Sequence, residues 1–146
     1  MTGGFTADHR RSRRIRGNNL IEFAMMLPLL LTMFMGIFDF GWVLHKQISM
    51  DNATREGARR GAIMATNSEI MTKVHNMVNF PISDSQISIH VYNATGTEVT
   101  NTDRTSGYTI EVDVDVPDVQ LVTPIRAFVS AIGPINLHSK AKFVIE

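Results

Sequence analysis

The feature that most constrains this 146-residue chain is an apolar stretch near its N-terminus. It runs from Leu20 to Leu44, and Glu22 and Asp39 are its only ionisable residues. A helix needs about 20 apolar residues to cross the roughly 30 Å hydrocarbon core of a bilayer. The stretch is long enough, so the sequence predicts a transmembrane helix at about residues 20–44, followed by one small domain.

Charge is distributed unevenly around this stretch. Residues 1–17 contain five arginines and one aspartate, which gives them a net charge of +4. Because the net charge of the whole chain is zero, the remaining residues together carry −4. Basic flanks of membrane helices are retained in the cytoplasm. The pattern therefore predicts a single-pass protein with a cytoplasmic N-terminus and an extracytoplasmic C-terminal domain.

The junction between the arginines and the apolar stretch predicts a processing site. An ordinary secretory signal has an apolar region of about 7–15 residues with a small-residue cleavage site after it. Here the apolar region is longer, and Gly17 lies before it instead. Cleavage between Gly17 and Asn18 would remove residues 1–17 as a basic cytoplasmic leader and make Glu22 the fifth residue of the mature chain.

The residues from Gly17 onward resemble a known family. Glu22-Phe23, five residues after Gly17, is similar to the class III prepilin signal of Flp-type pilins, and the continuation is similar to TadE-like proteins of the tight-adherence (Tad) pilus system. The matching residues are Glu22-Phe23-Ala24, Pro28, the Leu29–Leu31 run, Gly36-Ile37, Asp39-Phe40-Gly41 and Asn52 to Arg59. The resemblance to specific residues ends there, and beyond residue 60 only the layout is shared.

This resemblance implies a minor pseudopilin of the bacterial inner membrane that supports assembly of a Tad/Flp-type adhesive pilus. The implied partners are the membrane, a prepilin peptidase that cleaves after Gly17, and other pilin or pseudopilin subunits with their assembly platform. Glu22 would meet the free amine of a neighbouring subunit. An alternative is an uncleaved single-pass scaffold of the secretion or pilus platform, in which Glu22 is an unpaired interfacial carboxylate.

Other residues of the stretch have roles that follow from their chemistry. Pro28 removes a backbone donor and predicts a kink near the start of the helix. Gly36 and Gly41 would let another helix approach closely. Asp39 is either a contact to a partner helix or a residue at the water boundary, and Trp42 fits the aromatic belt of a membrane interface.

The helix is expected to continue beyond the membrane, because no proline separates Leu44 from Ala65. Residues 18–65 thus form one TadE-like region. The small residues of the extension suit close packing against a sheet or a neighbouring helix, and they are Ala53, Gly57, Ala58, Gly61 and Ala62.

Residues 66–146 are predicted to form a small α+β domain. Thr66 and Glu69 form a capping box that starts a helix with Ile70, Val74, Met77 and Val78 on one face, ended by Pro81. Three strands are predicted, at Gln86–Tyr92, Tyr108–Val116 and Ile135–Ile145 (Leu137, Ala141 and Phe143 inward), with Asn93 to Gly107 as a long loop. A further helix is expected after Thr123-Pro124, with a stripe of Ile125, Phe128, Val129 and Ile132. The fold class is therefore α+β and pilin-like, with a long transmembrane helix that extends onto a three-stranded antiparallel sheet.

Candidate chemistry is sparse in this sequence. The chain has no cysteine, and its five histidines lack metal-ligand spacing. Asp113, Asp115 and Asp118 suggest a calcium site, but alternation places the first two on the solvent face of a strand, where Lys140 and Lys142 can pair with them. We therefore expect no enzyme activity, no cofactor, no metal and no nucleic-acid partner.

Overall fold

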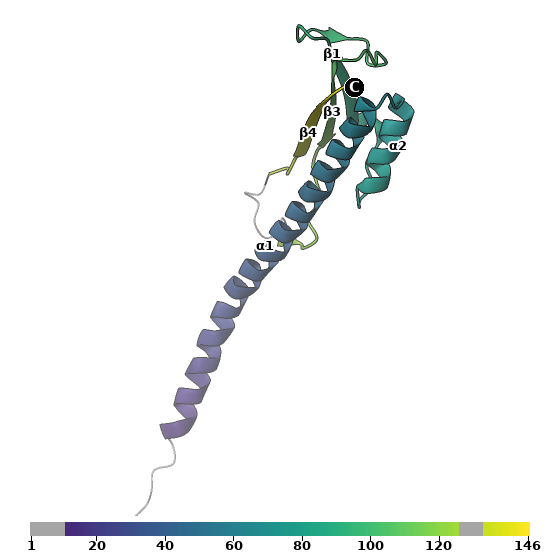
Figure 1. Ribbon diagram of the computed structural model, residues 1–146. Coiled ribbons are helices and arrows are strands. Elements are labelled where there is room, and N and C mark those ends of the chain that lie inside the picture. Colours follow the sequence, from purple (N-terminus) through teal and green to yellow (C-terminus); the bar gives the residue numbers. More distant parts are fainter. Residues whose placement is uncertain (1–10, 126–132) are drawn as a thin grey trace, which may run out of the picture.

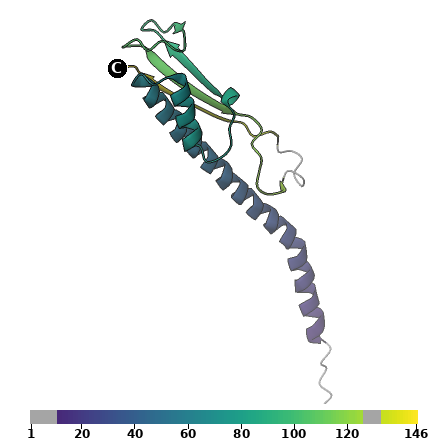
Figure 2. The ribbon, with the colours of Figure 1, turned by 90° about the vertical axis from the view of Figure 1, so that its right-hand side faces the viewer.

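The computed structural model describes residues 11–125 and 133–146, with side chains from Asn19 onward. Helix α1 spans Arg11–Ala62, 52 residues, and projects from a small domain as a long rod (Figure 1). The predicted continuation of the apolar helix beyond Leu44 is therefore confirmed. The rod is bent, and its purple N-terminal part runs more steeply than the rest in Figure 2; Pro28 lies inside this helix.

The domain contains a four-stranded antiparallel sheet in the order β2-β1-β3-β4. Its strands are β1 (Ile87–Tyr92), β2 (Glu98–Val99), β3 (Thr109–Val116) and β4 (Leu137–Val144). The prediction of three strands was wrong by one. Strand β2 lies in the predicted loop after Asn93, where Val99 pairs with Val91 and Glu98 with Tyr92.

Helix α2 spans Asn67–Met77 and begins with the predicted capping box. The backbone N–H of Thr66 donates to Glu69 Oε2 at 2.8 Å, and Glu69 N–H donates to Thr66 Oγ1 at 3.3 Å. Ile70 and Val74 are fully buried as expected. Met77 is instead 38% exposed, because the helix ends there and Val78 continues into the core in extended conformation. A short 3₁₀ turn, η1 (Asp84–Gln86), leads into β1.

The core lies between the two helices and one face of the sheet (Figure 2). The predicted small-residue face of α1 is buried against this sheet and against α2. A Cβ atom at Gly57 would lie 2.7 Å from Val74 Cγ2, and one at Gly61 would overlap Ile110 Cδ1. These glycines let the helix axis approach the sheet closely, and alternate residues of β1 and β3 complete the core: Ile87, Ile89, Val91, Ile110, Val112 and Val114.

Strand β4 follows its predicted alternation in part. Leu137 and Ala141 are buried, and Ser139 takes the buried position between them. Phe143 is 39% exposed, because β4 is an edge strand and its outer flank is uncovered. Most of the helix predicted after Thr123-Pro124, including Phe128, Val129 and Ile132, lies outside the described residues.

Candidate functional site

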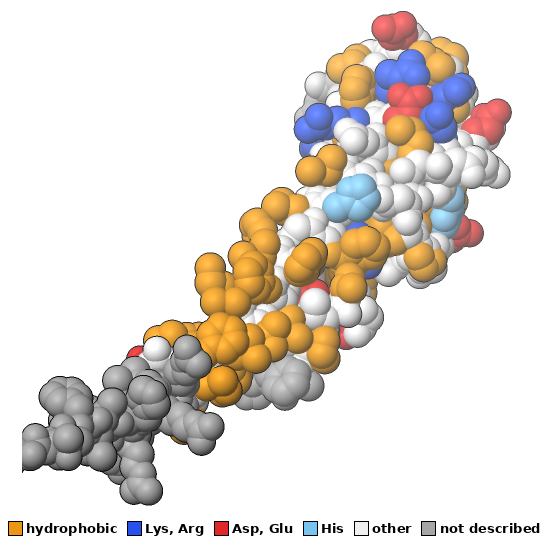
Figure 3. Space-filling view, turned by 90° about the horizontal axis from the view of Figure 1, so that it is seen from below, with side chains coloured by type: hydrophobic (Ala, Val, Ile, Leu, Met, Phe, Trp, Pro, Cys, Tyr) orange, Lys and Arg blue, Asp and Glu red, His pale blue; other side chains and the backbone are white. Residues whose placement is uncertain are grey.

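The N-terminal half of α1 presents large apolar side chains to its surroundings. Figure 3 shows them gathered along the rod, away from the charged side chains of the domain. Leu20, Met25 and Leu29 are each more than 70% exposed, and none of the most apolar 18-residue window is buried. By length and composition, α1 could cross a membrane.

The residues predicted for processing and assembly lie at the N-terminal end of this half. Gly17 and Asn18 fall within α1, ahead of the first described side chain. Glu22 and Phe23 are exposed. Further along, Thr32 Oγ1 donates to the carbonyl of Pro28 at 2.8 Å, a bond of the type that favours bending of helices. Cleavage and the role of Glu22 remain predictions.

Asp39 makes a contact that the sequence reasoning missed. Its carboxylate is only 4% exposed, although it lies on the otherwise exposed half of α1. Oδ1 accepts the backbone N–H of Val122 at 3.0 Å and of Thr123 at 2.9 Å, and Oδ2 accepts the Thr123 hydroxyl. We call this set of bonds the Asp39 clasp. It ties the segment after β3 to α1 within one chain, which was not among the predicted roles.

The two glycines of this region have different surroundings. A Cβ atom at Gly36 would lie 3.8 Å from Ile125 Cδ1, whereas one at Gly41 would meet nothing within 4 Å. Beside the clasp lies an apolar cavity of about 340 Å³ between α1 and the segment after β3, lined by Gly36, Asp39, Phe40, Val43, Leu121, Ile125 and Ile135. Gly36 therefore packs against Ile125 of its own chain, whereas the surface of α1 at Gly41 is uncovered.

Polar residues directly after Leu44 attach α1 to the domain. Gln47 Nε2 donates to the carbonyl of His138 at 3.0 Å, and Ser49 Oγ accepts Asn79 N–H at 3.2 Å. Lys46 Nζ lies 5.5 Å from the ring centroid of Trp42 and 5.0 Å from that of Phe80. These contacts hold the first residues after the apolar stretch against the domain.

The sheet face that points away from the helices carries a group of ion pairs. Glu111 is 2% exposed and lies 2.8 Å from Lys140 Nζ and 2.6 Å from Lys142 Nζ; Lys140 also lies 3.6 Å from Asp113. Burial raises the pKa of Glu111, but the hydrogen bonds from the two lysines outweigh it and hold the pKa below its ordinary value. The predicted pairing across β3 and β4 is confirmed for Asp113 with Lys140. Among the described residues Asp115 forms an ion pair with neither lysine and lies opposite His138. Glu111 is covered rather than solvated.

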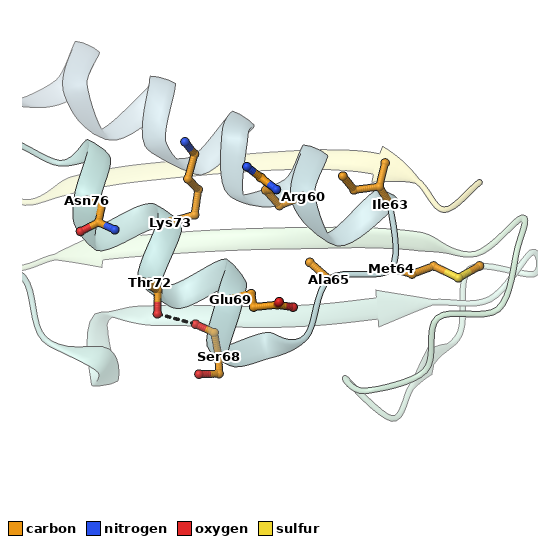
Figure 4. Close-up of a pocket in the computed structure, with 9 residues that line it drawn as sticks. All are labelled: Arg60, Ile63, Met64, Ala65, Ser68, Glu69, Thr72, Lys73 and Asn76. Atoms are coloured by element: carbon orange, nitrogen blue, oxygen red, sulfur yellow. Dashed lines mark hydrogen bonds between the residues drawn. The ribbon is translucent and has the colours of Figure 1, made fainter.

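A hollow of about 510 Å³ lies between the end of α1 and α2 (Figure 4). Its charged residues make contacts within the fold: Glu69 belongs to the capping box, and Arg60 and Lys73 lie 3.9 and 4.0 Å from Glu56. Within residues 11–125 and 133–146, no group of three or more His, Cys, Asp or Glu side chains could hold a metal ion.

Comparison with known families gives a match to this same part of the chain, helix α1. The family model described as TadE-like protein matches residues 20–59. This segment covers the exposed apolar half of α1, Asp39 and the start of the small-residue face. The match confirms the resemblance and is consistent with a protein of the Tad pilus system. No curated protein and no solved structure matches the chain.

Proposed function

We propose that this chain, whose residues 20–59 are TadE-like, is a membrane-anchored minor pseudopilin that supports assembly of a Tad/Flp-type adhesive pilus. It is anchored in the bacterial inner membrane by residues 20–44 and processed between Gly17 and Asn18 by a prepilin peptidase. The observation that carries the proposal is the exposed apolar half of α1, which continues without a break into the folded domain.

Exposed side chains on this half need an apolar environment. Leu29 is 75% exposed and Phe38 is 72% exposed, and the large apolar residues surround α1 rather than forming one stripe. A helix that is apolar all round is suited to lipid or to a bundle of other apolar helices. The same surface therefore serves an anchored subunit in the membrane and a subunit packed among pilin helices.

Glu22 is the charged group at the start of this surface, and it is exposed. A charge at the centre of a membrane helix costs roughly 2.5–3.5 kcal/mol on insertion scales, and less near the ends. After cleavage, the new amine of Asn18 on a neighbouring subunit would offset that cost by pairing with the carboxylate. Glu22 thereby sets the register between adjacent helices.

Assembly in this proposal is structural rather than catalytic. The anchor places the domain outside the cytoplasm, and the rigid connection through residues 45–51 fixes the domain relative to the membrane. The chain is itself the substrate of the peptidase at Gly17.

The deciding experiment is the intact mass of membrane-extracted protein from cells with and without the prepilin peptidase. We expect a chain that begins at Asn18 only when the peptidase is present. A full-length chain in both strains would overturn processing and favour the uncleaved scaffold.

A matched pair of variants tests the assembly role. Glu22→Gln should abolish or strongly reduce surface pili while the chain stays in the membrane. Thr32→Ala, on the same helix, should assemble pili normally, since Thr32 bonds only to the backbone of its own helix among the contacts described. Normal piliation of the Glu22 variant would contradict the proposed pairing.

A further inference from the structure

The Asp39 clasp fixes the depth of a loop relative to the apolar helix. Leu20 and Asp39 are separated by 19 residues, or about 28 Å at roughly 1.5 Å per residue of α-helix. The hydrocarbon core of a bilayer is about 30 Å thick. If Leu20 lies at the inner boundary, Asp39 lies at the outer one, and its bonds hold Val122 and Thr123 at the same level.

The loop surface at this level is apolar. Val122 is 63% exposed, and with Ile37, Phe38, Gly41, Trp42 and His45 it lines an open depression of about 330 Å³. Trp42, 42% exposed, is the residue type enriched at membrane interfaces. Apolar surface thus passes from the helix onto the loop.

Two backbone N–H groups of the loop are suited to this depth as well. Irregular backbone is tolerated at membrane depth only where its N–H and C=O groups are satisfied within the protein. The clasp satisfies the N–H groups of Val122 and Thr123 with a carboxylate, and it occupies the Thr123 hydroxyl. The same bonds bury the charge of Asp39 away from lipid.

We infer that Val122 and Trp42 form a membrane-contacting rim, with which the domain rests on the outer surface of the bilayer that α1 spans. The occupant of this surface is lipid, because the rim continues the apolar surface of the helix at the boundary set by helix length. The inference rests on the proposed function in that α1 must cross the membrane.

The test uses fluorescence quenching by brominated phospholipids in vesicles that contain the full chain. Trp42 is the only tryptophan, so in the unmodified chain it reports directly on the rim, and bromines near the headgroups should quench it. A Trp42→Phe background, which keeps an apolar aromatic side chain at this position, accepts single new probes. Val122→Trp reports on the rim and Leu30→Trp on the middle of the helix. Val144→Trp, at a 60% exposed site on the far end of the domain, is the matched control.

We expect bromines near the headgroups to quench the Val122 probe strongly, with blue-shifted emission, and to leave the Val144 probe unchanged. Quenching at Leu30 without quenching at Val122 would contradict membrane contact of the rim but would still support a membrane-spanning α1. Absence of quenching at both sites would instead overturn the anchor itself. Protection of the Val122 probe from both bromolipid and aqueous iodide would show a protein cover, which also contradicts the inference.

A second probe guards against disturbance of the clasp by a bulky tryptophan. The chain has no cysteine, so Val122→Cys can be labelled uniquely with a polarity-sensitive fluorophore. Its emission should shift to the blue on reconstitution into vesicles, whereas the same label at Val144→Cys should not shift. Equal, water-like emission at both sites would reject the rim.

Discussion

Two parts of α1 differ in the size of their side chains. From Leu20 to Leu44 the helix carries mostly leucine, methionine and phenylalanine, and these side chains are exposed. From Met50 to Ala62 its buried positions are mainly alanine and glycine, packed against α2 and the sheet. The exposed side chains of the first part and the buried side chains of the second part are both mostly apolar. Side-chain volume separates the exposed part of α1 from the part that packs against its own domain.

We expect the largest effect on domain stability when side-chain volume is added to the packed part of α1, which removes the contrast between the two parts. Gly61→Val would place side-chain atoms against Ile110 and Ile70, both fully buried and without space to move. Overpacking of this kind costs about 1–3 kcal/mol or more. We expect a lower thermal midpoint for the domain in detergent, followed by near-UV circular dichroism.

Gly41→Val is the matched control, because nothing lies within 4 Å of a Cβ at that position. It should leave the midpoint of the domain almost unchanged. Equal destabilisation by both variants would remove the distinction between the two parts of α1.

The second prediction concerns the place where the exposed part contacts its own domain. Asp39→Asn replaces one acceptor oxygen with a donor and weakens the bonds to Val122 and Thr123. Hydrogen bonds to charged groups contribute about 1.5–3 kcal/mol, so amide exchange at these two residues should accelerate by roughly 10- to 100-fold. Hydrogen-exchange mass spectrometry of the loop peptide measures this change.

Asp51→Asn is the control on the same helix, since Asp51 accepts a bond from Gln47 four residues earlier. It should leave exchange of the loop peptide unaltered. Unchanged exchange in the Asp39 variant would mean that the clasp does not hold the loop.

The smallest expected effect is a pH dependence of stability that affects the domain and not the exposed part of α1. The lowered pKa of Glu111 contributes stability that is present above the unfolded-state pKa and is lost as pH falls through the folded-state pKa. Acidification below about pH 4 should therefore lower the thermal midpoint of the domain, while the helicity of the exposed part of α1 in detergent persists. Thermal scans between pH 7 and pH 3 measure both.

Glu111→Gln should flatten this pH dependence and cost about 1–2 kcal/mol at pH 7, because two lysines lose their charged partner. Asp115→Asn, on an exposed position of the same strand, should retain the wild-type acid profile. An unchanged profile in the Glu111 variant would assign the acid sensitivity to other groups.

Local patterns in the sequence were sufficient to predict most of the architecture. The run from Leu20 onward, the capping box at Thr66 and the alternation in β3 each arise from neighbours within a few residues, and each gave the correct element. Strand β2 was missed because two residues, Glu98 and Val99, are too few to show a period.

The candidate site was less predictable because its contacts are long-range. Asp39 and Thr123 are 84 positions apart in the sequence, and no pattern between them links the two. Alternation places Glu111 on the same face of β3 as Asp113, which we expected to be solvated, but two lysines from another strand cover Glu111. The motif around Gly17 and Glu22 indicated a processing signal, and no contact of the described side chains tests it.

The position of β4 has a consequence for how the chain is made. This strand pairs with β3 and packs on α1, yet it is synthesised after every other described element. Until it emerges, the edge of β3 that pairs with it and the part of α1 that contacts it stay uncovered. Helix α1 is thus complete early, whereas the sheet can close on it only after β4 has been made. A chain that lacked β4 would therefore carry α1 beside an open edge of β3, with backbone groups left unpaired.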